Sequence, residues 1–290
     1  METSAGAGVA TARGAARLLP EGRTAVMGIL NVTPDSFSDG GRYAATDAAL
    51  AHAGRMIAEG ADLIDVGGES TRPGASPVDA AAERDRILPV VAALRAATAL
   101  PISIDTTKAD VAAAALAVGA DMVNDVSAGR CDAGMLPLVA ARGAAIVLMH
   151  MQGTPATMQD APSYGDVVAE VAAFLAARAA AARAAGIAPE RIWLDPGIGF
   201  GKRPAHNLAL LAGLERLVEL GHPIVVGASR KGFLGALSGD PVDARLPASL
   251  AAAVLAAADG ARVVRAHDVG ATRSALAVGD ALARARRVHG

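Results

Sequence analysis

Short apolar runs alternate with longer alanine-rich stretches along nearly the whole chain. The short runs are rich in Val, Ile, Leu and Met and are apolar on both faces, which is typical of strands in a parallel sheet covered by helices. The longer stretches place their apolar residues at helical spacing. The predicted strands are Ala25–Asn31, Asp62–Gly67, Pro101–Asp105, Asp121–Asp125, Ala144–His150, Arg191–Asp195, Pro223–Ala228 and Arg262–Ala266. The predicted helices are Asp47–Gly60, Asp79–Ala97, Ala109–Val118, Ala133–Ala141, Tyr164–Ala185, Asn207–Leu220, Pro247–Asp259 and Ala271–Arg286.

Glycines mark the ends of several of these helices. Gly60, Gly119, Gly143 and Gly260 each stand just before the next predicted strand. A left-handed residue, most often glycine, commonly ends a helix at such a position. The eight strand–helix cycles between about residues 25 and 286 match the size of a (β/α)8 TIM barrel, an α/β fold. A doubly wound open sheet is the alternative architecture.

The chain shows no internal boundary between domains. No linker rich in Pro, Gly or Ser and no run of charge divides the sequence. We therefore expect one domain over residues 21–290, preceded by an N-terminal extension over residues 1–20 that is expected to be poorly ordered.

Composition excludes several classes of partner. Of 290 residues, 27 are Lys or Arg and 29 are Asp or Glu, which gives a net charge of −2. With only 2% aromatic residues and no long basic run, the chain offers neither the charge nor the stacking surface of a nucleic-acid or anionic-membrane binder. The apolar stretch Leu250–Ala258 is far shorter than the roughly 18 to 20 residues that span a bilayer. Residues 1–20 lack the apolar core of a secretory signal, so we expect a cytoplasmic protein. The single cysteine, Cys131, allows no internal disulfide and no zinc site of thiolates.

Polar residues gather directly after the predicted strands. In a TIM barrel the active site is built from the loops that follow the strands, so these residues are expected to share one pocket. In chain order the segments are 31–41, 67–74, Asp105–Thr107, Asn124–Asp125, His150, Asp195–Lys202, Ser229–Lys231 and Arg265–Asp268.

The chemistry of these residues suits a polar ring that carries an anionic tail. Asp105, Asp195 and Asn124 can face the N–H groups of a heterocycle. Arginines 72 and 265, His267 and backbone N–H groups suit phosphate oxygens. The two long, glycine-bearing loops over residues 31–41 and 67–74 are expected to close over the reacting centre.

Simpler structural roles are open for some of these residues. Asp105 taken alone fits the N-cap of the following helix. The Gly197-x-Gly199-x-Gly201-Lys202 segment matches neither common phosphate-loop pattern, so a tight turn against Phe200 is favoured. Residues 83–85 (Glu-Arg-Asp) suggest a solvated helix face, and Cys131 an ordinary small residue.

Taken together, the motifs resemble those of the dihydropteroate synthase family. The segment 28–41, GILNVTPDSFSDGG, is similar to the family's signature. Further segments resemble the family's other blocks, in its order: 65–74 (DVGGESTRPG), 103–106 (SIDT), 124–127 (NDVS), 195–202 (DPGIGFGK), 227–231 (GASRK) and 265–269 (RAHDV). The resemblance covers roughly residues 21–286.

The resemblance implies a transferase of folate biosynthesis that is a target of sulfonamides. It would join 6-hydroxymethyl-7,8-dihydropterin diphosphate to p-aminobenzoate and release diphosphate and 7,8-dihydropteroate. It also implies a homodimer formed through helices outside the barrel. The family's motifs assign four sets of residues to ligands. The pterin would be held by Asp105, Asn124, Asp195 and Lys231, with Gly227 and Met149 lining its slot, and Mg²⁺ would be contacted by Asn31. The diphosphate would be contacted by Thr71, Arg72, Arg265 and His267, and p-aminobenzoate by Phe37, Pro73, Phe200 and Ser229.

The site residues agree with a dissociative displacement. Loss of diphosphate leaves a cationic methylene group on the pterin, which Asp105 and Asp195 would stabilise. Three positions depart from the family's usual residues, Ile198, Arg203 and Ala266, and none of them is assigned to a ligand. Two alternatives use the same barrel: a non-catalytic pterin-binding paralogue, and a methyltransferase that takes its methyl group from a tetrahydrofolate.

Overall fold

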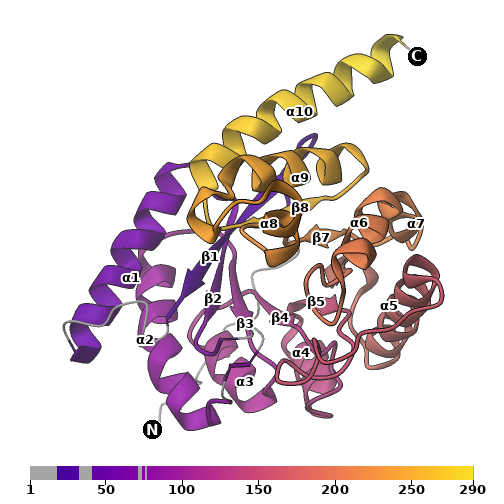
Figure 1. The fold of residues 1–290 in the computed structure, drawn as a ribbon. Helices are drawn as coiled ribbons and strands as arrows, with labels where there is room; N and C mark the ends of the chain where they lie inside the picture. Colours follow the sequence, from indigo (N-terminus) through magenta and orange to yellow (C-terminus); the bar gives the residue numbers. More distant parts are fainter. Residues whose placement is uncertain (1–17, 33–40, 71–73, 76, 290) are drawn as a thin grey trace, which may run out of the picture.

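A computed structural model describes residues 18–32, 41–70, 74, 75 and 77–289, and these residues form a parallel (β/α)8 barrel (Figure 1). The strands are β1 (Ala25–Asn31), β2 (Leu63–Gly67), β3 (Ile102–Asp105), β4 (Met122–Asp125), β5 (Ala145–Met149), β6 (Ile192–Asp195), β7 (Val225–Val226) and β8 (Val263–Ala266). Their order is β6-β5-β4-β3-β2-β1-β8-β7. A parallel bridge between Leu194 and Ile224 joins the two ends of this order, so the sheet closes on itself. The predicted TIM barrel is confirmed.

Helices cover the outside of the barrel, as Figure 1 shows. They are α1 (Gly41–Ala58), α2 (Ala80–Ala97), α3 (Ala109–Ala117), α4 (Met135–Arg142), α5 (Val167–Ala184), α6 (Pro204–Ala212), α7 (Leu214–Val218), α8 (Gly232–Ser238), α9 (Leu246–Ala258) and α10 (Val269–His289). The helix predicted over 207–220 is split between α6 and α7 at Gly213, where a side chain would press on Val168. Helix α8 was not predicted, because its seven residues include two glycines and are too few to show a helical period.

A Gly-Ala-Asp sequence before two of the strands builds the same local structure twice. Gly60 and Gly119 have φ angles of +95° and +115°, and a side chain at either position would collide with an arginine that crosses it. The aspartates that follow each accept a hydrogen bond at 2.9 Å from a backbone N–H at the start of the preceding strand: Asp62 from Val26 N, the second residue of β1, and Asp121 from Ile102 N, the first residue of β3. The glycine ends the helix, and the aspartate then fixes the neighbouring strand.

The barrel interior has an apolar lower layer and a polar upper layer. Successive inward positions on a strand are two residues apart, so each strand contributes to both layers. The lower layer contains Met27, Leu63, Met122, Val147, Trp193, Val225 and Val263. Two residues further along, the same strands carry Asp65, Asn124, Met149, Asp195, Gly227 and Arg265, and β3 adds Asp105. We call Asp65, Asp105, Asn124, Asp195 and Arg265 the polar layer.

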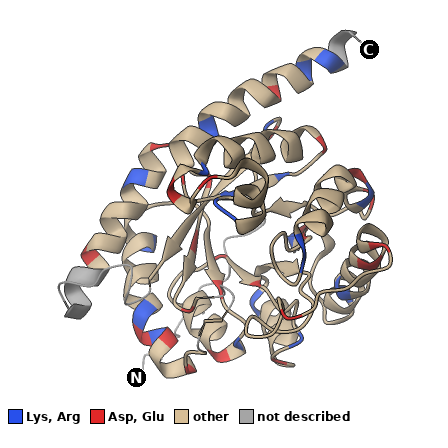
Figure 2. Cartoon of the chain, in the orientation of Figure 1, with Lys and Arg blue, Asp and Glu red and all other residues tan. Residues whose placement is uncertain are grey.

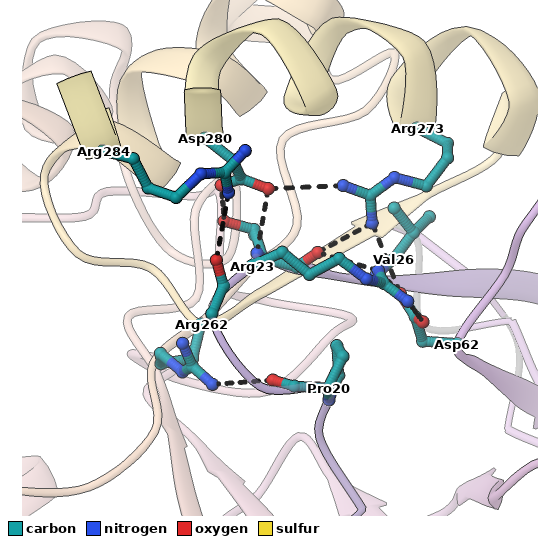
Figure 3. Close-up of polar contacts among 10 residues, drawn as sticks. Pro20, Arg23, Val26, Asp62, Arg262, Arg273, Asp280 and Arg284 are labelled. Carbon is teal, nitrogen blue, oxygen red and sulfur yellow. Dashed lines mark hydrogen bonds and ion pairs between the residues drawn. The ribbon is translucent and has the colours of Figure 1, made fainter. Parts of the chain in front are cut away.

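The N-terminal segment closes the base of the barrel. Leu18 and Leu19 pack against the apolar lower layer. They lie in the part of the predicted N-terminal extension that the structure describes, whereas residues 1–17 lie outside the described residues. Arg262 and Arg284 donate to the carbonyls of Pro20 and Gly22 at 3.1 and 3.2 Å (Figure 3). Arg284 of α10 and Arg262, directly before β8, therefore hold the N-terminal segment against this end of the barrel.

The outer surface carries charges of both signs. Figure 2 shows basic and acidic residues interspersed over the helices, without a large area of one sign. In the part of the chain that the structure describes, every helix is too short or too polar to cross a bilayer.

Candidate active site

The guanidinium of Arg265 lies at the centre of the polar layer. Its Nε donates to Asp65 Oδ2 at 2.6 Å, and its Nη2 donates to Asp105 Oδ2 at 2.9 Å. Asn124 Nδ2 also donates to Asp65 Oδ2, at 3.0 Å. Strands β2, β3, β4 and β8 thus converge on one hydrogen-bonded group. Asp105 is part of it and does not cap the next helix, because the N-cap of α3 is Lys108.

Two carboxylate oxygens of this group are free to accept a ligand. Asp65 Oδ1 and Asp105 Oδ1 are buried and have no hydrogen-bond partner among the described residues. Burial raises the pKa of Asp105 to about 7, and the nearby Arg265 opposes this rise. An N–H donor entering the pocket would relieve the cost of these unpaired oxygens.

Asp65 was not predicted as a site residue. Its side chain is fully buried and contacts both Arg265 and Asn124. One signal was available in the sequence: Asp65 is a charged residue inside the short apolar run of β2, two positions after the inward-facing Leu63.

Asp195 and Lys231 lie across the barrel from this group. Asp195 Oδ1 accepts a hydrogen bond from Gly197 N at 2.6 Å, and burial raises the pKa of Asp195. Lys231 Nζ donates to the carbonyl of Ile198 and lies 4.6 Å from the centre of the Phe200 ring. Burial lowers the pKa of Lys231 to about 8, although Asp195 opposes the change. The two side chains therefore present an acceptor and a donor to the same space.

Gly227, directly after β7, and Met149, the last residue of β5, were assigned to the pterin slot by the family resemblance, and both lie near the polar layer. A Cβ on Gly227 would lie 3.7 Å from Arg265 Cβ and 3.8 Å from Lys231 Nζ, so a side chain there would occupy the space between the two cations. Met149 belongs to a small apolar cluster with Val126, Met151 and Met158, against which Phe200 packs. This cluster gives the polar pocket one apolar wall.

Ser229 and His267 meet above β7 and β8. Ser229 Oγ lies 3.0 Å from His267 Nδ1 and accepts a hydrogen bond from His267 N at 3.3 Å. Beside them Arg230 donates to both oxygens of Asp268, at 3.0 and 2.5 Å. The family resemblance assigned Ser229 to p-aminobenzoate and His267 to diphosphate, and in the structure the two side chains are in contact.

Four predicted site residues lie outside the described residues: Phe37, Thr71, Arg72 and Pro73. The second loop is described on both sides of the gap. Glu69 accepts hydrogen bonds from Lys108 Nζ and, at 3.1 Å, from Val78 N. Lys108 Nζ also donates to Glu83 Oε2 at 2.6 Å. The expectation of a solvated face at residues 83–85 is wrong for Glu83, which is fully buried, because Lys108 provides it with an ion pair.

A second buried cation lies beneath the loop after β6. Lys202 is 3% exposed, and its Nζ lies 3.0 Å from His150 Nδ1 and 2.9 Å from the carbonyl of Phe200. Burial lowers the pKa of Lys202 to about 7 and that of His150 to about 3. The segment 197–202 forms the predicted tight turn, with Gly197, Gly199 and Gly201 at positive φ.

The site fits a magnesium ion that arrives with a phosphorylated substrate. Within the described ranges, no three His, Cys, Asp or Glu side chains are grouped to hold a metal ion. Asn31, the predicted Mg²⁺ contact, ends β1 and pairs in register with Gly67, which pairs in turn with Asp105. A Cβ on Gly67 would lie 3.7 Å from Asn31 Oδ1 and 3.9 Å from Asp105 Oδ2. Mg²⁺ commonly takes one or two protein oxygens together with substrate phosphates, and the amide oxygen of Asn31 is a ligand of this kind.

Comparison with known proteins agrees with this geometry. Residues 27–267 match the family model described as "Pterin binding enzyme". The dihydropteroate synthase of Mycobacterium leprae is 53% identical over 260 residues, which cover 87% of this chain and 91% of that protein. The Yersinia pestis dihydropteroate synthase, solved in a sulfonamide complex, is 46% identical with a TM-score of 0.87, and the match covers 94% of this chain and 98% of that one. The Xanthomonas albilineans enzyme, solved with 7,8-dihydropteroate, is 49% identical with a TM-score of 0.81 and coverage of 90% and 94%. With its convergent polar layer and these matches, the chain belongs to the dihydropteroate synthase family of pterin-binding enzymes.

Proposed function

We propose that the protein catalyses the dihydropteroate synthase reaction by a dissociative displacement assisted by Mg²⁺. In this reaction 6-hydroxymethyl-7,8-dihydropterin diphosphate and p-aminobenzoate give 7,8-dihydropteroate and diphosphate. The observation that carries the proposal is the polar layer, which places carboxylates, an amide and buried cations in one pocket at the carboxyl ends of the strands. Membership of the family supports the same assignment.

The pocket offers a pterin ring the partners that its edge requires. The ring's amino group and ring N–H are donors, and Asp195 together with the free oxygen of Asp105 can accept from them. Lys231 Nζ and the Asn124 amide can donate to the ring's carbonyl and nitrogen acceptors. Met149 and Phe200 supply the apolar surface beside the ring.

The chemical step follows from the charges around the ring. The bond between the methylene carbon and the diphosphate oxygen breaks, and its electron pair leaves with the diphosphate. The methylene cation spreads into the ring, where Asp105 and Asp195 stabilise it. The aniline nitrogen of p-aminobenzoate then forms the new C–N bond and loses a proton, so the step needs no protein nucleophile.

The developing charge on diphosphate would be met by Arg265 and His267, which lie two residues apart at the end of β8. Arg265 also pairs with Asp65 and Asp105 in the polar layer, and Ser229 Oγ contacts His267 Nδ1. Asn31 would contact Mg²⁺ together with oxygens of the substrate. Neutralisation of charge on the leaving diphosphate is the chemistry that the bound metal supplies.

We also propose a homodimer formed through α9 and α10. Leu255 on α9 is 65% exposed, and Val278 and Leu282 on α10 are 62% and 56% exposed. The end of α10 projects beyond the barrel in Figure 1, which leaves its apolar positions accessible to a second copy. Light scattering at micromolar concentration should report twice the mass of one chain, and replacing Val278 and Leu282 by Glu should give monomers.

The activity is tested by mixing the protein with dihydropterin diphosphate, Mg²⁺ and p-aminobenzoate and leaving out each component in turn. Formation of dihydropteroate and diphosphate that requires all three supports the proposal. Absence of product, with dihydropterin still bound in calorimetry, would indicate a non-catalytic pterin-binding protein. Transfer of a methyl group from methyltetrahydrofolate to a corrinoid would indicate the methyltransferase.

A further inference from the structure

The loop after β6, residues 196–202, is held from several sides. Gln159 Nε2 donates to the Gly199 carbonyl at 2.8 Å, and the Tyr164 hydroxyl donates to the Gly201 carbonyl at 2.7 Å. Side chains outside the loop thus fix its backbone. Lys202 is different, because it belongs to the loop and directs its own amino group back beneath it.

The amino group of Lys202 joins two loops. Its Nζ lies 2.9 Å from the Phe200 carbonyl in the loop after β6. It also lies 3.0 Å from His150 Nδ1 and 3.4 Å from the His150 carbonyl, directly after β5. Because the pKa of His150 is held at about 3, its ring is neutral and can accept a hydrogen bond. Three acceptors therefore match the three N–H bonds of the ammonium.

These contacts do not explain Lys202 as a stabilising residue. Among the described residues its hydrogen-bond partners are all neutral, and the side chain is almost fully buried. Burial of this amino group costs folding free energy, since burial lowers the pKa of Lys202 to about 7 although the charge of Asp195 opposes the change. A methionine of similar length would fill the space without that cost. The hydrogen bond from Lys202 Nζ to the Phe200 carbonyl instead fixes the position of Phe200.

Phe200 lies where the two loops meet the pocket. Its ring packs against Met149, Met151 and Met158, and Lys231 Nζ lies 4.6 Å from the ring centre. Lys202 holds the carbonyl of this same residue. A shift of the loop would therefore move the ring relative to Lys231.

We propose that Lys202 is a positioning residue, which fixes the Phe200 ring as a wall for the aromatic amine substrate by joining the Phe200 backbone to His150. This inference rests on the proposed function, because p-aminobenzoate is the aromatic substrate concerned. Lys202 itself touches neither substrate in this assignment.

The test is the Lys202→Met variant, which keeps the length of the side chain and removes its N–H donors. We expect the KM for p-aminobenzoate to rise about tenfold, since misplacement of a substrate-contacting group by an ångström can cost up to about a hundredfold. The dissociation constant of dihydropterin diphosphate should change less than about twofold, and the thermal midpoint should stay equal or rise. An unchanged KM, or equal losses for both substrates together with a lower midpoint, would overturn the proposal.

Arg95→Met is the matched control. Arg95 also holds backbone carbonyls, those of Thr98 and Leu100 at 2.5 and 2.8 Å, but it lies at the base of the barrel beside Asp121. This variant should lower the thermal midpoint and leave both KM values unchanged. A rise in the KM for p-aminobenzoate in Arg95→Met would show that the effect is general loosening of the barrel, which would overturn the assignment.

Variants of His150 keep the test decisive if Lys202→Met does not fold. His150→Leu removes one of the three acceptors and should raise the KM for p-aminobenzoate about threefold, whereas the amide oxygen of His150→Gln should restore it. Equal KM values in both variants would count against the proposal. Product formation by the wild-type protein tests the proposed function separately. If it forms no product, calorimetric binding of p-aminobenzoate with pterin and diphosphate present replaces KM as the readout.

Discussion

The two ends of the barrel use the same charged residue types in opposite ways. At the base, Asp62 accepts hydrogen bonds from Arg23 and Val26, and Asp280 accepts two from Thr24 (Figure 3). Arg273 joins both carboxylates, at 3.5 and 3.4 Å. These groups satisfy one another without any ligand.

The mouth of the barrel leaves its polar groups incompletely satisfied. Among the described residues, Asp65 and Asp105 each keep a buried oxygen without a hydrogen-bond partner. Burial raises the pKa values of Asp105 and Asp195 and lowers the pKa of Lys231, which favours the neutral form of each group. Such groups lower stability but can bind a polar ligand. The charges at the base are therefore paired with one another in the folded chain, whereas those at the mouth keep buried oxygens available for a ligand.

The largest effect is expected for Asp195→Ala at the mouth. Because we propose that the Asp195 carboxylate accepts hydrogen bonds from the pterin ring, its loss should abolish detectable pterin binding, and activity should fall at least about a hundredfold. Calorimetry with dihydropterin and a product assay measure the two quantities. If pterin affinity stays within a few fold of wild type, the carboxylate does not hold the ring.

Arg265→Ala should distinguish binding of the pterin ring from binding of its diphosphate group. Affinity for dihydropterin diphosphate should fall more than affinity for dihydropterin, measured side by side in calorimetry. Because the change leaves Asp65 and Asp105 buried without their cation, unfolding free energy should also fall by about 3 kcal/mol. Equal affinity losses for the two ligands in Asp195→Ala and in Arg265→Ala would remove the proposed division of roles.

Asp62→Ala tests the base of the barrel. This change removes the carboxylate that accepts hydrogen bonds from Arg23, Arg273 and Val26 N, so the free energy of unfolding should fall by about 2 to 3 kcal/mol. Urea unfolding monitored by the fluorescence of Trp193 measures this change. Activity at 25 °C should remain near wild type. Asp110→Ala, at an exposed position of α3, is the control and should cost less than about 0.5 kcal/mol. Loss of activity in folded Asp62→Ala would mean that the two ends are coupled.

The smallest expected effect is a pH dependence from His150. Burial lowers the pKa of His150 from 6.5 to about 3, so between these values the unfolded chain binds a proton that the folded protein excludes. Stability is therefore lost as the pH falls through this window, by about 2 kcal/mol between pH 7 and pH 5 for this group. In urea unfolding, the free energy of unfolding of the wild type should fall more steeply with falling pH than that of His150→Gln. Parallel curves would contradict a neutral buried His150.

Most elements were predictable because local pattern determines them. Strand β1 has the predicted bounds, and several other strands begin one residue later than predicted. Asp62 and Asp121 stand directly before β2 and β4, where each carboxylate accepts a hydrogen bond from the neighbouring strand. The predicted site residues on β3, β4, β6 and β8 follow from the same pattern, since strand ends in a barrel share one mouth.

The sequence by itself determined the barrel, the ends of its strands and the residue types at its mouth. Periodicity and chain order are local properties, and a parallel barrel brings all strand ends together. Only the tertiary structure decided that Arg265 joins Asp65 and Asp105, that Glu83 is buried with Lys108, and that Lys202 lies beneath Phe200. These contacts join residues that are far apart in the sequence or depend on how a loop folds back. The distances between the contacting atoms are therefore fixed by the closure of the barrel and the packing of its loops.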